Sequence, residues 1–318
     1  MTDRANLKGS GVWLDGIMGV IIGDALGCPV QFRSRSEVKA NPVDRMLGYG
    51  TYHMPAGTWT DDGSLTLALL CSIREKGVID LQDIMDRFEA WFTRGAYTPF
   101  GKAFDIGGAT EASIRRYMKN PDVRTCGGTH AFDNGNGSLM RILPACLYAH
   151  EQKLSDGEAV RIVHEVSGLT HNHLRAKIAC GLYYFCVCAV LDGTGDLAGR
   201  LQQGMDRGFA FYRGDVRNLT ELSYYERLKD LTAFASVPEE KIKSSGYVVD
   251  SLEAAIWCLV TTDSFRDCEL KAVNLGEDTD TVGAIAGGLA GLYYTYGSIP
   301  KDWLDVIRRR EWIEGLCG

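Results

Sequence analysis

Two short acidic segments hold the residues of this chain that are best suited to chemistry. The first is Thr60-Asp61-Asp62, which follows a loop and leads into a helical apolar pattern that begins at Leu65. Thr and Asp side chains at a helix start can simply cap free backbone N–H groups, and acidic groups there suit the positive end of the helix dipole. Taken alone, this segment leaves both capping and metal binding open.

The second segment is Asp278-Thr279-Asp280-Thr281, which follows Glu277 and also opens a helical pattern. Glu277, Asp278 and Asp280 place three carboxylates within four residues, which is more than capping requires. Crowded carboxylates repel one another unless protons or cations neutralise them, and hard divalent cations prefer carboxylate and hydroxyl oxygens. The two segments together predict a site for two Mg²⁺ or Mn²⁺ ions rather than Zn²⁺. The predicted ligands are Thr60, Asp61, Asp62, Asp278, Asp280 and Thr281.

The composition narrows the class of protein that could carry this site. The chain has 318 residues, 45% of them hydrophobic, and a formal net charge of −7, which argues against a nucleic-acid partner. Its ten cysteines include no CxxC pair, and no apolar signal segment leads the sequence. We therefore expect reduced core thiols and a cytoplasmic location. The apolar stretch 12–30 contains Asp15 and Asp24, which would be costly in lipid, so we expect a buried helix and no membrane partner.

Helical periodicity dominates the elements that must position the acidic segments. Apolar residues recur at steps of three and four over 81–92, and the stretch 173–191 is apolar nearly all round, as expected of a central buried helix. Two helical stretches, 12–30 and 282–292, repeat glycine at a cost of about 1 kcal/mol each, which predicts close packing of their backbones. Residues 213–247 are the most polar stretch and are expected to form a mobile excursion. The sequence predicts an all-α, multi-helix protein with residues 1–318 in a single compact domain.

The chain also resembles the ADP-ribosylglycohydrolase family, of the dinitrogenase-reductase-activating type. The resemblance follows six segments in the family's order: 19–27, 57–62, 104–107, 136–144, 170–171 and 276–281. It implies an all-α fold with a central two-metal cleft. It also implies hydrolysis at the anomeric carbon of the ribose, which removes ADP-ribose from modified protein side chains.

The resemblance implies roles for individual residues as well. The six predicted metal ligands match the family's ligands. Asp105 matches an aspartate that handles substrate near the scissile bond, and Asn136, Gly137 and Ser138 match a loop that cradles the diphosphate. His171 matches a histidine that lines the cleft, although a core histidine remains the alternative. The candidate catalytic carboxylates are Asp62, Asp105 and Asp280, and the sequence does not rank them as bases.

One position departs from the family pattern. Many relatives place a glutamate on a flap over the metals, where this chain has Gln31. Gln31 is therefore expected at the substrate site, and its missing charge leaves open a non-catalytic ADP-ribose-binding or structural protein. A two-metal nucleotide phosphohydrolase, which would release phosphate, is the other alternative. For the hydrolase we expect ADP-ribosyl-arginine as substrate, because a carboxylate such as Asp105 can pair with a guanidinium.

Overall fold

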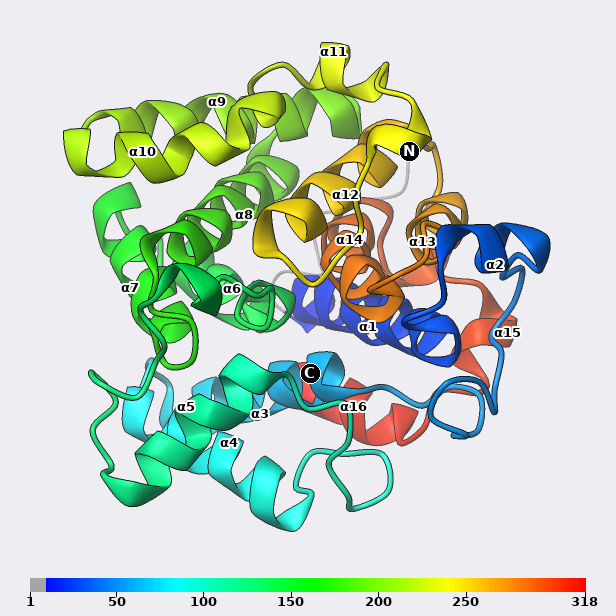
Figure 1. The fold of residues 1–318 in the computed structure, drawn as a ribbon, viewed down its shortest axis with the longest axis horizontal. Helices are drawn as coiled ribbons and strands as arrows, with labels where there is room; N and C mark the ends of the chain where they lie inside the picture. The colour runs from blue at the N-terminus through cyan, green and yellow to red at the C-terminus, as the bar shows by residue number, and fades with distance from the viewer. Residues whose placement is uncertain (1–9) are drawn as a thin grey trace.

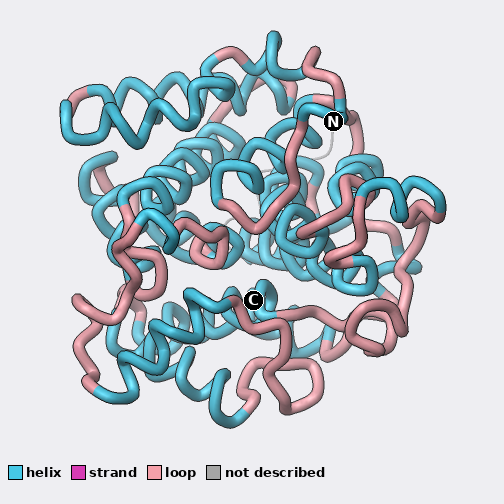
Figure 2. The backbone as a smooth tube through the Cα atoms, viewed as in Figure 1, coloured by secondary structure: helices cyan, strands magenta, loops and turns pink. Residues whose placement is uncertain are grey.

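The apolar periodicity of the sequence corresponds to helices throughout residues 10–318, the part of the chain that this computed structural model describes. The first eight are α1 (Ser10–Gly27), α2 (Arg35–Ala40), α3 (Asp61–Lys76), α4 (Leu81–Arg94), α5 (Gly108–Lys119), α6 (Leu143–Glu151), α7 (Asp156–Gly168) and α8 (Leu174–Asp192). The next eight are α9 (Leu197–Arg213), α10 (Leu219–Leu222), α11 (Leu231–Ala235), α12 (Val248–Val260), α13 (Phe265–Val273), α14 (Thr279–Tyr294), α15 (Lys301–Leu304) and α16 (Arg310–Cys317). Figure 2 shows these helices joined by loops, and the described residues contain no β-strand, so the all-α prediction is confirmed.

Short 3-10 helices occupy several of the connections. They are η2 (Cys28–Val30), η3 (Ala131–Asp133), η4 (Leu139–Arg141), η5 (Val216–Asn218), η6 (Ser223–Lys229), η7 (Glu239–Lys241) and η8 (Tyr296–Ser298). Two isolated backbone bridges, Gly128 to His171 and Gly135 to Tyr247, connect loops near the N-terminal end of α8.

Helices α1 and α14 pack directly against each other at the centre of the molecule (Figure 1). A Cβ on Gly19 would lie 2.0 Å from the Gly287 carbonyl oxygen, and one on Gly23 would lie 2.1 Å from that of Gly283. The predicted close packing of these two helices is therefore confirmed, because no other residue type fits. The crossing brings the start of α14 against the end of α1, where a Cβ on Gly27 would lie 2.3 Å from the Asp280 nitrogen.

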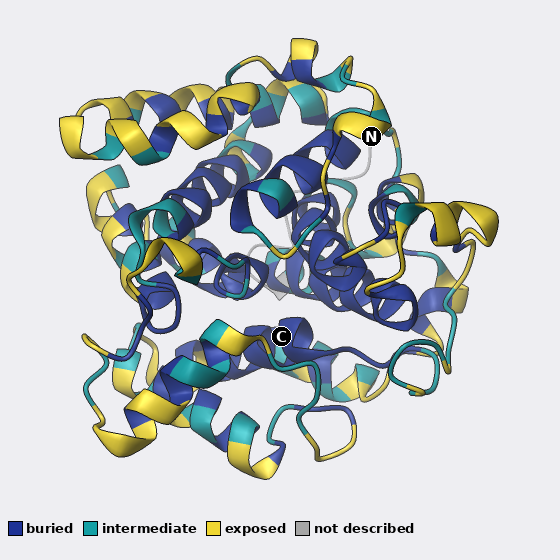
Figure 3. Ribbon diagram, viewed as in Figure 1, coloured by how far each residue is buried: buried dark blue, intermediate teal, exposed yellow. Residues whose placement is uncertain are grey.

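Helix α8 is buried along nearly its whole length, as predicted for 173–191 (Figure 3). Two segments, Gly11–Val30 and Leu174–Asp192, are long and apolar enough to cross a membrane, but 78% of each apolar window is buried inside the protein. A core helix of a globular protein has the same properties. Both segments therefore behave as central helices around which the other elements pack.

Helices α3, α4 and α5 lie beneath the α1–α14 pair in Figure 1. The predicted amphipathic helix over 81–92 is confirmed as α4, whose start is capped by the Asp80 side chain and whose end is marked by Gly95 in the left-handed conformation. The buried apolar side chains form one continuous cluster that extends from Trp13 to Cys317. Residues 1–9 lie outside the described part, so the single domain over 1–318 stays a prediction.

The polar stretch 213–247 differs from its predicted form. It folds into η5, α10, η6, α11 and η7, which pack on α8, α9 and α12. Apolar anchors hold it to the core, and they are Leu222, Tyr225, Leu228, Leu231, Phe234 and Ile242. The polar composition reflects its exposed outer face, while one buried residue every few positions is enough to fix the segment in place.

Candidate metal and substrate site

The first acidic segment is held in place by a carboxylate from another helix. Asp24, fully buried near the end of α1, accepts the Thr60 backbone N–H at 2.9 Å and the Gly63 N–H at 2.7 Å. These bonds satisfy backbone donors at the start of α3 that would otherwise be unpaired. Burial raises the pKa of Asp24 to about 7, although the N–H bonds act in the opposite direction. No role for Asp24 was predicted from the sequence. The feature that could have indicated one is a carboxylate inside an otherwise apolar helix.

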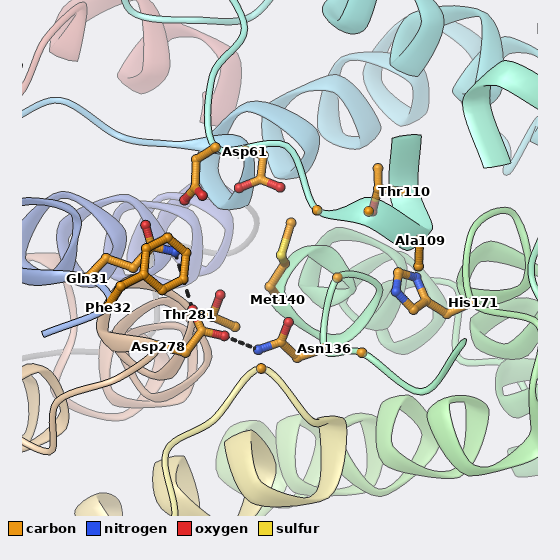
Figure 4. Close-up of a pocket in the computed structure, with 16 residues that line it drawn as sticks. Gln31, Phe32, Asp61, Ala109, Thr110, Asn136, Met140, His171, Asp278 and Thr281 are labelled. Atoms are coloured by element: carbon orange, nitrogen blue, oxygen red, sulfur yellow. Dashed lines mark hydrogen bonds between the residues drawn. The ribbon is translucent and has the colours of Figure 1, made fainter. Parts of the chain in front are cut away.

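The two acidic segments, 219 residues apart, meet where α3 and α14 begin. The hydroxyls of Thr60 and Thr281 each donate to the same oxygen, Asp62 Oδ2, at 3.3 Å. Asp61, Asp278 and Thr281 line a pocket of about 240 Å³. Figure 4 shows their side chains facing this pocket from two elements. The structure thus brings the predicted ligands together, with Thr60, Asp62 and Asp280 buried behind the pocket wall.

Asp105 joins these carboxylates, and the five residues Asp61, Asp62, Asp105, Asp278 and Asp280 are called here the acidic cluster. Burial raises the pKa of Asp61, Asp62 and Asp280 well above the usual carboxyl range, and mutual repulsion within the cluster raises it further. Burial also raises the pKa of Asp278, against hydrogen bonds that lower it. The cluster therefore has a strong tendency to bind protons or cations.

Several oxygens of the cluster make no hydrogen bond within the described residues. They are Asp62 Oδ1, Asp105 Oδ2 and Asp280 Oδ2, together with the neighbouring Gln31 Oε1. A buried polar atom without a partner typically costs about 1–3 kcal/mol. The unpaired atoms are all oxygens, which fits the donors that hard divalent cations require. No group of three or more His, Cys, Asp or Glu side chains within residues 10–318 is arranged to hold an ion by itself, so hydroxyl oxygens would have to complete the coordination.

Asp105 occupies a strained position that its sequence context did not reveal. Its backbone φ is 52°, in the left-handed region that non-glycine residues rarely adopt. The hydroxyl of Tyr52 donates to Asp105 Oδ1, and the Tyr52 ring packs edge-on against Phe104. Asp105 therefore lies close to the carboxylates of the two acidic segments and is held by Tyr52. Its other oxygen, Oδ2, is buried without a hydrogen-bond partner, and the residue lines the pocket.

The segment around Gln31 does reach the acidic cluster. Gln31 Nε2 lies 3.4 Å from Asp278 Oδ1, and the side chain is 4% exposed. The Phe32 N–H donates to the Glu277 carbonyl at 2.6 Å, and the Glu277 N–H donates to that of Arg33 at 2.7 Å. This pairing fixes the segment against the loop before α14 and holds Phe32 at a φ of 64°, with its ring exposed at the pocket mouth.

The predicted diphosphate loop extends from Asp278 to His171 along the pocket, and its side chains act differently from one another. Asn136 Nδ2 donates to Asp278 Oδ2 at 2.6 Å and to Ser251 Oγ at 2.8 Å, so this amide orients a predicted metal ligand. Gly137 lines the pocket. The Ser138 side chain points into the core, where it accepts from Ser167 Oγ at 2.9 Å, and Ser138 is not among the residues that line the pocket.

Glycines form much of the pocket wall, and the sequence analysis missed most of them. The glycine wall consists of Gly107, Gly108, Gly135, Gly137 and Gly246. Gly107 caps the start of α5 without a side-chain hydrogen bond, so this helix presents its positive end to the pocket. His171 lies beside this wall, fully enclosed, and burial lowers its pKa to about 3. Backbone donors, a helix start and a neutral histidine form a surface suited to an anionic group.

Comparisons with known proteins identify the family to which this fold belongs. The sequence pattern of the ADP-ribosylglycohydrolase family matches residues 13–318. The ADP-ribosylarginine hydrolase Tri1 of Serratia proteamaculans (strain 568) is 29% identical over 95% of this chain and 76% of its own length. The ADP-ribosyl-[dinitrogen reductase] glycohydrolase of Rhodospirillum rubrum is 30% identical over 92% of this chain and 88% of its own length. A solved ADP-ribosylglycohydrolase-related protein complex superposes with a TM-score of 0.76, at 29% identity, over 97% of this chain and 96% of that one. The chain therefore belongs to the ADP-ribosylglycohydrolase family.

Proposed function

We propose that this protein is a metal-dependent hydrolase that removes ADP-ribose from modified protein side chains, with ADP-ribosyl-arginine as its substrate. The observation that carries the proposal is the acidic cluster with its unpaired oxygens, which opens into a pocket whose wall is formed in large part by glycine. The cluster suits cations and the ribose hydroxyls, and the glycine wall suits a diphosphate. The names of the Serratia and Rhodospirillum relatives support the same activity.

The proposed cofactors are two divalent cations, Mg²⁺ or Mn²⁺, held by the oxygens of the two acidic segments. Thr60, Asp61, Asp62, Asp278, Asp280 and Thr281 are the proposed ligands. When bound, the cations would orient the ribose hydroxyls and activate a water for attack at the anomeric carbon. The chain's own contribution is to hold the ligands in position: Asp24 fixes the Thr60 end, and Asn136 with Gln31 fixes Asp278.

The arginine assignment depends on Asp105. Tyr52 holds one oxygen of this carboxylate, and the other is buried without a donor in a residue that lines the pocket. A guanidinium can donate to that oxygen, whereas a serine ether oxygen has no proton to donate and would leave it desolvated without compensation. Asp62 and Asp280, each with one unpaired oxygen, are the candidate acceptors for the proton of the attacking water.

The test is chromatography of products after incubation with ADP-ribosyl-arginine or ADP-ribosyl-serine, with Mg²⁺, Mn²⁺ or a chelator. We expect metal-dependent release of free ADP-ribose, faster from the arginine conjugate. Release of phosphate or AMP would instead identify a phosphohydrolase. Tight binding of ADP-ribose without turnover under any metal would identify a non-catalytic binding protein, to which Gln31 in place of a charged residue would contribute.

The partners that follow are an ADP-ribosylated protein as substrate and ADP-ribose as product, without nucleic acid or membrane. We also propose the cytoplasm as the place of action. All ten cysteines are buried free thiols, which suits a reducing compartment. Fractionation of cells that produce the protein would test this location directly.

A further inference from the structure

A buried arginine that the proposed mechanism does not use lies next to the substrate pocket. Arg141, at the end of η4, is fully buried and pairs with no carboxylate among residues 10–318. Its Nη2 donates to Thr170 Oγ1 at 2.8 Å and to the Val166 carbonyl at 3.4 Å, while Nε and Nη1 have no partner. The guanidinium also stacks over the Phe88 ring, 4.5 Å from its centre. Burying a charge in this way is costly, which points to a specific task for the contact with Thr170.

Thr170 links this arginine to His171. Thr170 Oγ1 lies 2.8 Å from His171 Nδ1. Arginine can only donate, so the hydroxyl oxygen must accept from Arg141 and its single proton remains to be donated. The one acceptor within hydrogen-bond reach of that proton is His171 Nδ1. An imidazole that accepts at Nδ1 and is neutral carries its proton on Nε2.

The backbone around this pair is fixed from several directions. The Gly128 N–H and the Ser113 hydroxyl both donate to the Thr170 carbonyl at 3.0 Å. The His171 N–H donates to the Ser167 carbonyl at 2.9 Å, and Ser167 Oγ lies 3.2 Å from the His171 carbonyl oxygen. The imidazole therefore has little freedom to turn away from Thr170.

The other side of the ring faces the glycine wall. A Cβ on Gly137 would lie 2.9 Å from His171 Cε1, and one on Gly135 would lie 3.4 Å from Nε2. His171 Nε2 makes no hydrogen bond to any described residue, and the residue lines the pocket. Its ring is seen at that end of the pocket in Figure 4.

We infer that Arg141 and Thr170 are positioning residues that fix His171 as its Nε2–H tautomer, so that it donates a hydrogen bond to a phosphate oxygen of the substrate. The inference rests on the proposed function for the identity of the ligand, though not for the tautomer. The opposite tautomer would aim a lone pair at the anion and repel it. A neutral donor also binds the anion without the charge that would slow product release.

The hydrogen-bonded chain Arg141–Thr170–His171 is called here the relay. Two measurements test it, and the first is independent of activity. Long-range ¹H–¹⁵N NMR of histidine-labelled protein, assigned with His171→Asn, should show the His171 proton on Nε2 and an unprotonated Nδ1. The second is ADP-ribose binding by calorimetry for Thr170→Val, which keeps the shape and removes the hydroxyl, and for Thr170→Ser, which keeps the hydroxyl. We expect roughly tenfold weaker binding for Thr170→Val, the size of one hydrogen bond to a charged group, and wild-type affinity for Thr170→Ser.

The outcomes separate the inference from the proposed function. A wild-type His171 protonated on Nδ1 would overturn the relay, and so would a Thr170→Val protein that binds ADP-ribose like the wild type. Binding of adenosine, which lacks the phosphates, can be followed by NMR titration. If Thr170→Val weakened adenosine binding as much as ADP-ribose binding, the phosphate contact would be overturned. A wild type that binds ADP-ribose and shows the Nε2–H tautomer, yet releases nothing from ADP-ribosyl-arginine, would overturn the proposed hydrolysis and leave the relay intact.

Discussion

The acidic cluster and the single buried acid Glu269 both carry carboxyl groups that are removed from water, and they differ in what can neutralise the charge. The acidic cluster opens into the substrate pocket, whereas Glu269 on α13 lies sealed beside the α1–α14 crossing. Both have carboxylate oxygens without hydrogen-bond partners among the described residues, and burial raises the pKa well above the usual range in both. The cluster adds repulsion between neighbours, which Glu269 lacks.

The difference shows which buried acids can serve function. Glu269 touches glycine backbone: a Cβ on Gly23 would lie 2.5 Å from its Oε2, and one on Gly287 would lie 3.3 Å from its carboxyl carbon. Its side chain is fully buried, and burial favours its protonated form. The cluster is accessible and surrounded by further oxygens, so a cation can neutralise it instead. Replacing one acid at a time by the amide of the same shape therefore distinguishes an acid that a cation can neutralise from one that is neutralised by its own proton.

Asp280→Asn should have the largest effect, because it removes a proposed metal ligand that is fully buried beside the other carboxylates of the cluster. Loss of even an outer partner of a metal ligand typically costs about 10- to 100-fold, so we expect hydrolysis to fall by more than roughly 100-fold. Mg²⁺ or Mn²⁺ should raise the melting temperature of the wild type, since a ligand of the folded state stabilises it, and should no longer do so for the variant.

A chelator provides the control for that change. Without divalent cations, Asp280→Asn should melt no lower than the wild type, because the amide removes a buried charge from a repelling cluster. Calorimetry that detects no divalent binding by the wild type at millimolar metal would contradict the metal site. An Asp280→Asn protein with wild-type metal affinity would remove this residue from the ligand set.

Asp105→Asn should have the next largest effect. The variant keeps the Tyr52 contact geometry and removes the charge that would meet the guanidinium. Loss of one charged hydrogen bond, about 1.5–3 kcal/mol, predicts a decrease in arginine-conjugate hydrolysis of roughly 10- to 100-fold. Metal affinity should fall less than activity, since Asp105 repels the other carboxylates of the cluster but is not itself a proposed metal ligand. Kinetics on both conjugates check this, and equal rates on arginine and serine would remove the arginine assignment.

Gln31→Glu should have a smaller effect of opposite sign. A new charge 3.4 Å from Asp278 would attract cations, and a Coulomb energy of about 1 kcal/mol near 4 Å in water predicts roughly fivefold tighter metal binding. Gln152→Glu, an exposed position after α6, changes the net charge equally and should change nothing. Metal titrations of both variants measure the difference. No change in Gln31→Glu would mean that a charge at this position does not act on the proposed metal site.

The sequence predicted those parts of the fold that are encoded locally. Helical periodicity located α4 and α8, and repeated glycine predicted the α1–α14 contact, because each signal lies within one element. The six proposed metal ligands also lie within two short segments, which the structure brings together.

Contacts between distant segments were not predictable in the same way. Tyr52 lies 53 residues from its acceptor Asp105, and Asp24 lies 36 residues from Thr60. Neither pair has a spacing that indicates contact, because the approach depends on how whole helices pack. The position of Glu269 was equally unpredictable, since nothing in the pattern of α13 indicates that its carboxyl faces the glycines of α1 and α14.

Glu269→Gln should have the smallest effect on function and a clear effect on the pH dependence of stability. Burial raises the pKa of Glu269 in the folded state well above its value of about 4.5 in the unfolded chain. Its contribution to the free energy of unfolding is therefore fully present below about pH 4.5 and is lost as pH rises toward the folded pKa, by at most about 1.4 kcal/mol per pH unit. Glutamine cannot ionise, so the variant should lose stability less steeply with rising pH, while any cost of its amide is the same at every pH. Thermal melts from pH 5 to pH 8 measure this difference in slope, alongside unchanged metal binding and hydrolysis at neutral pH. Parallel melting curves for the two proteins would show that Glu269 is neutralised by something other than its proton, and a loss of metal binding would join Glu269 to the acidic cluster.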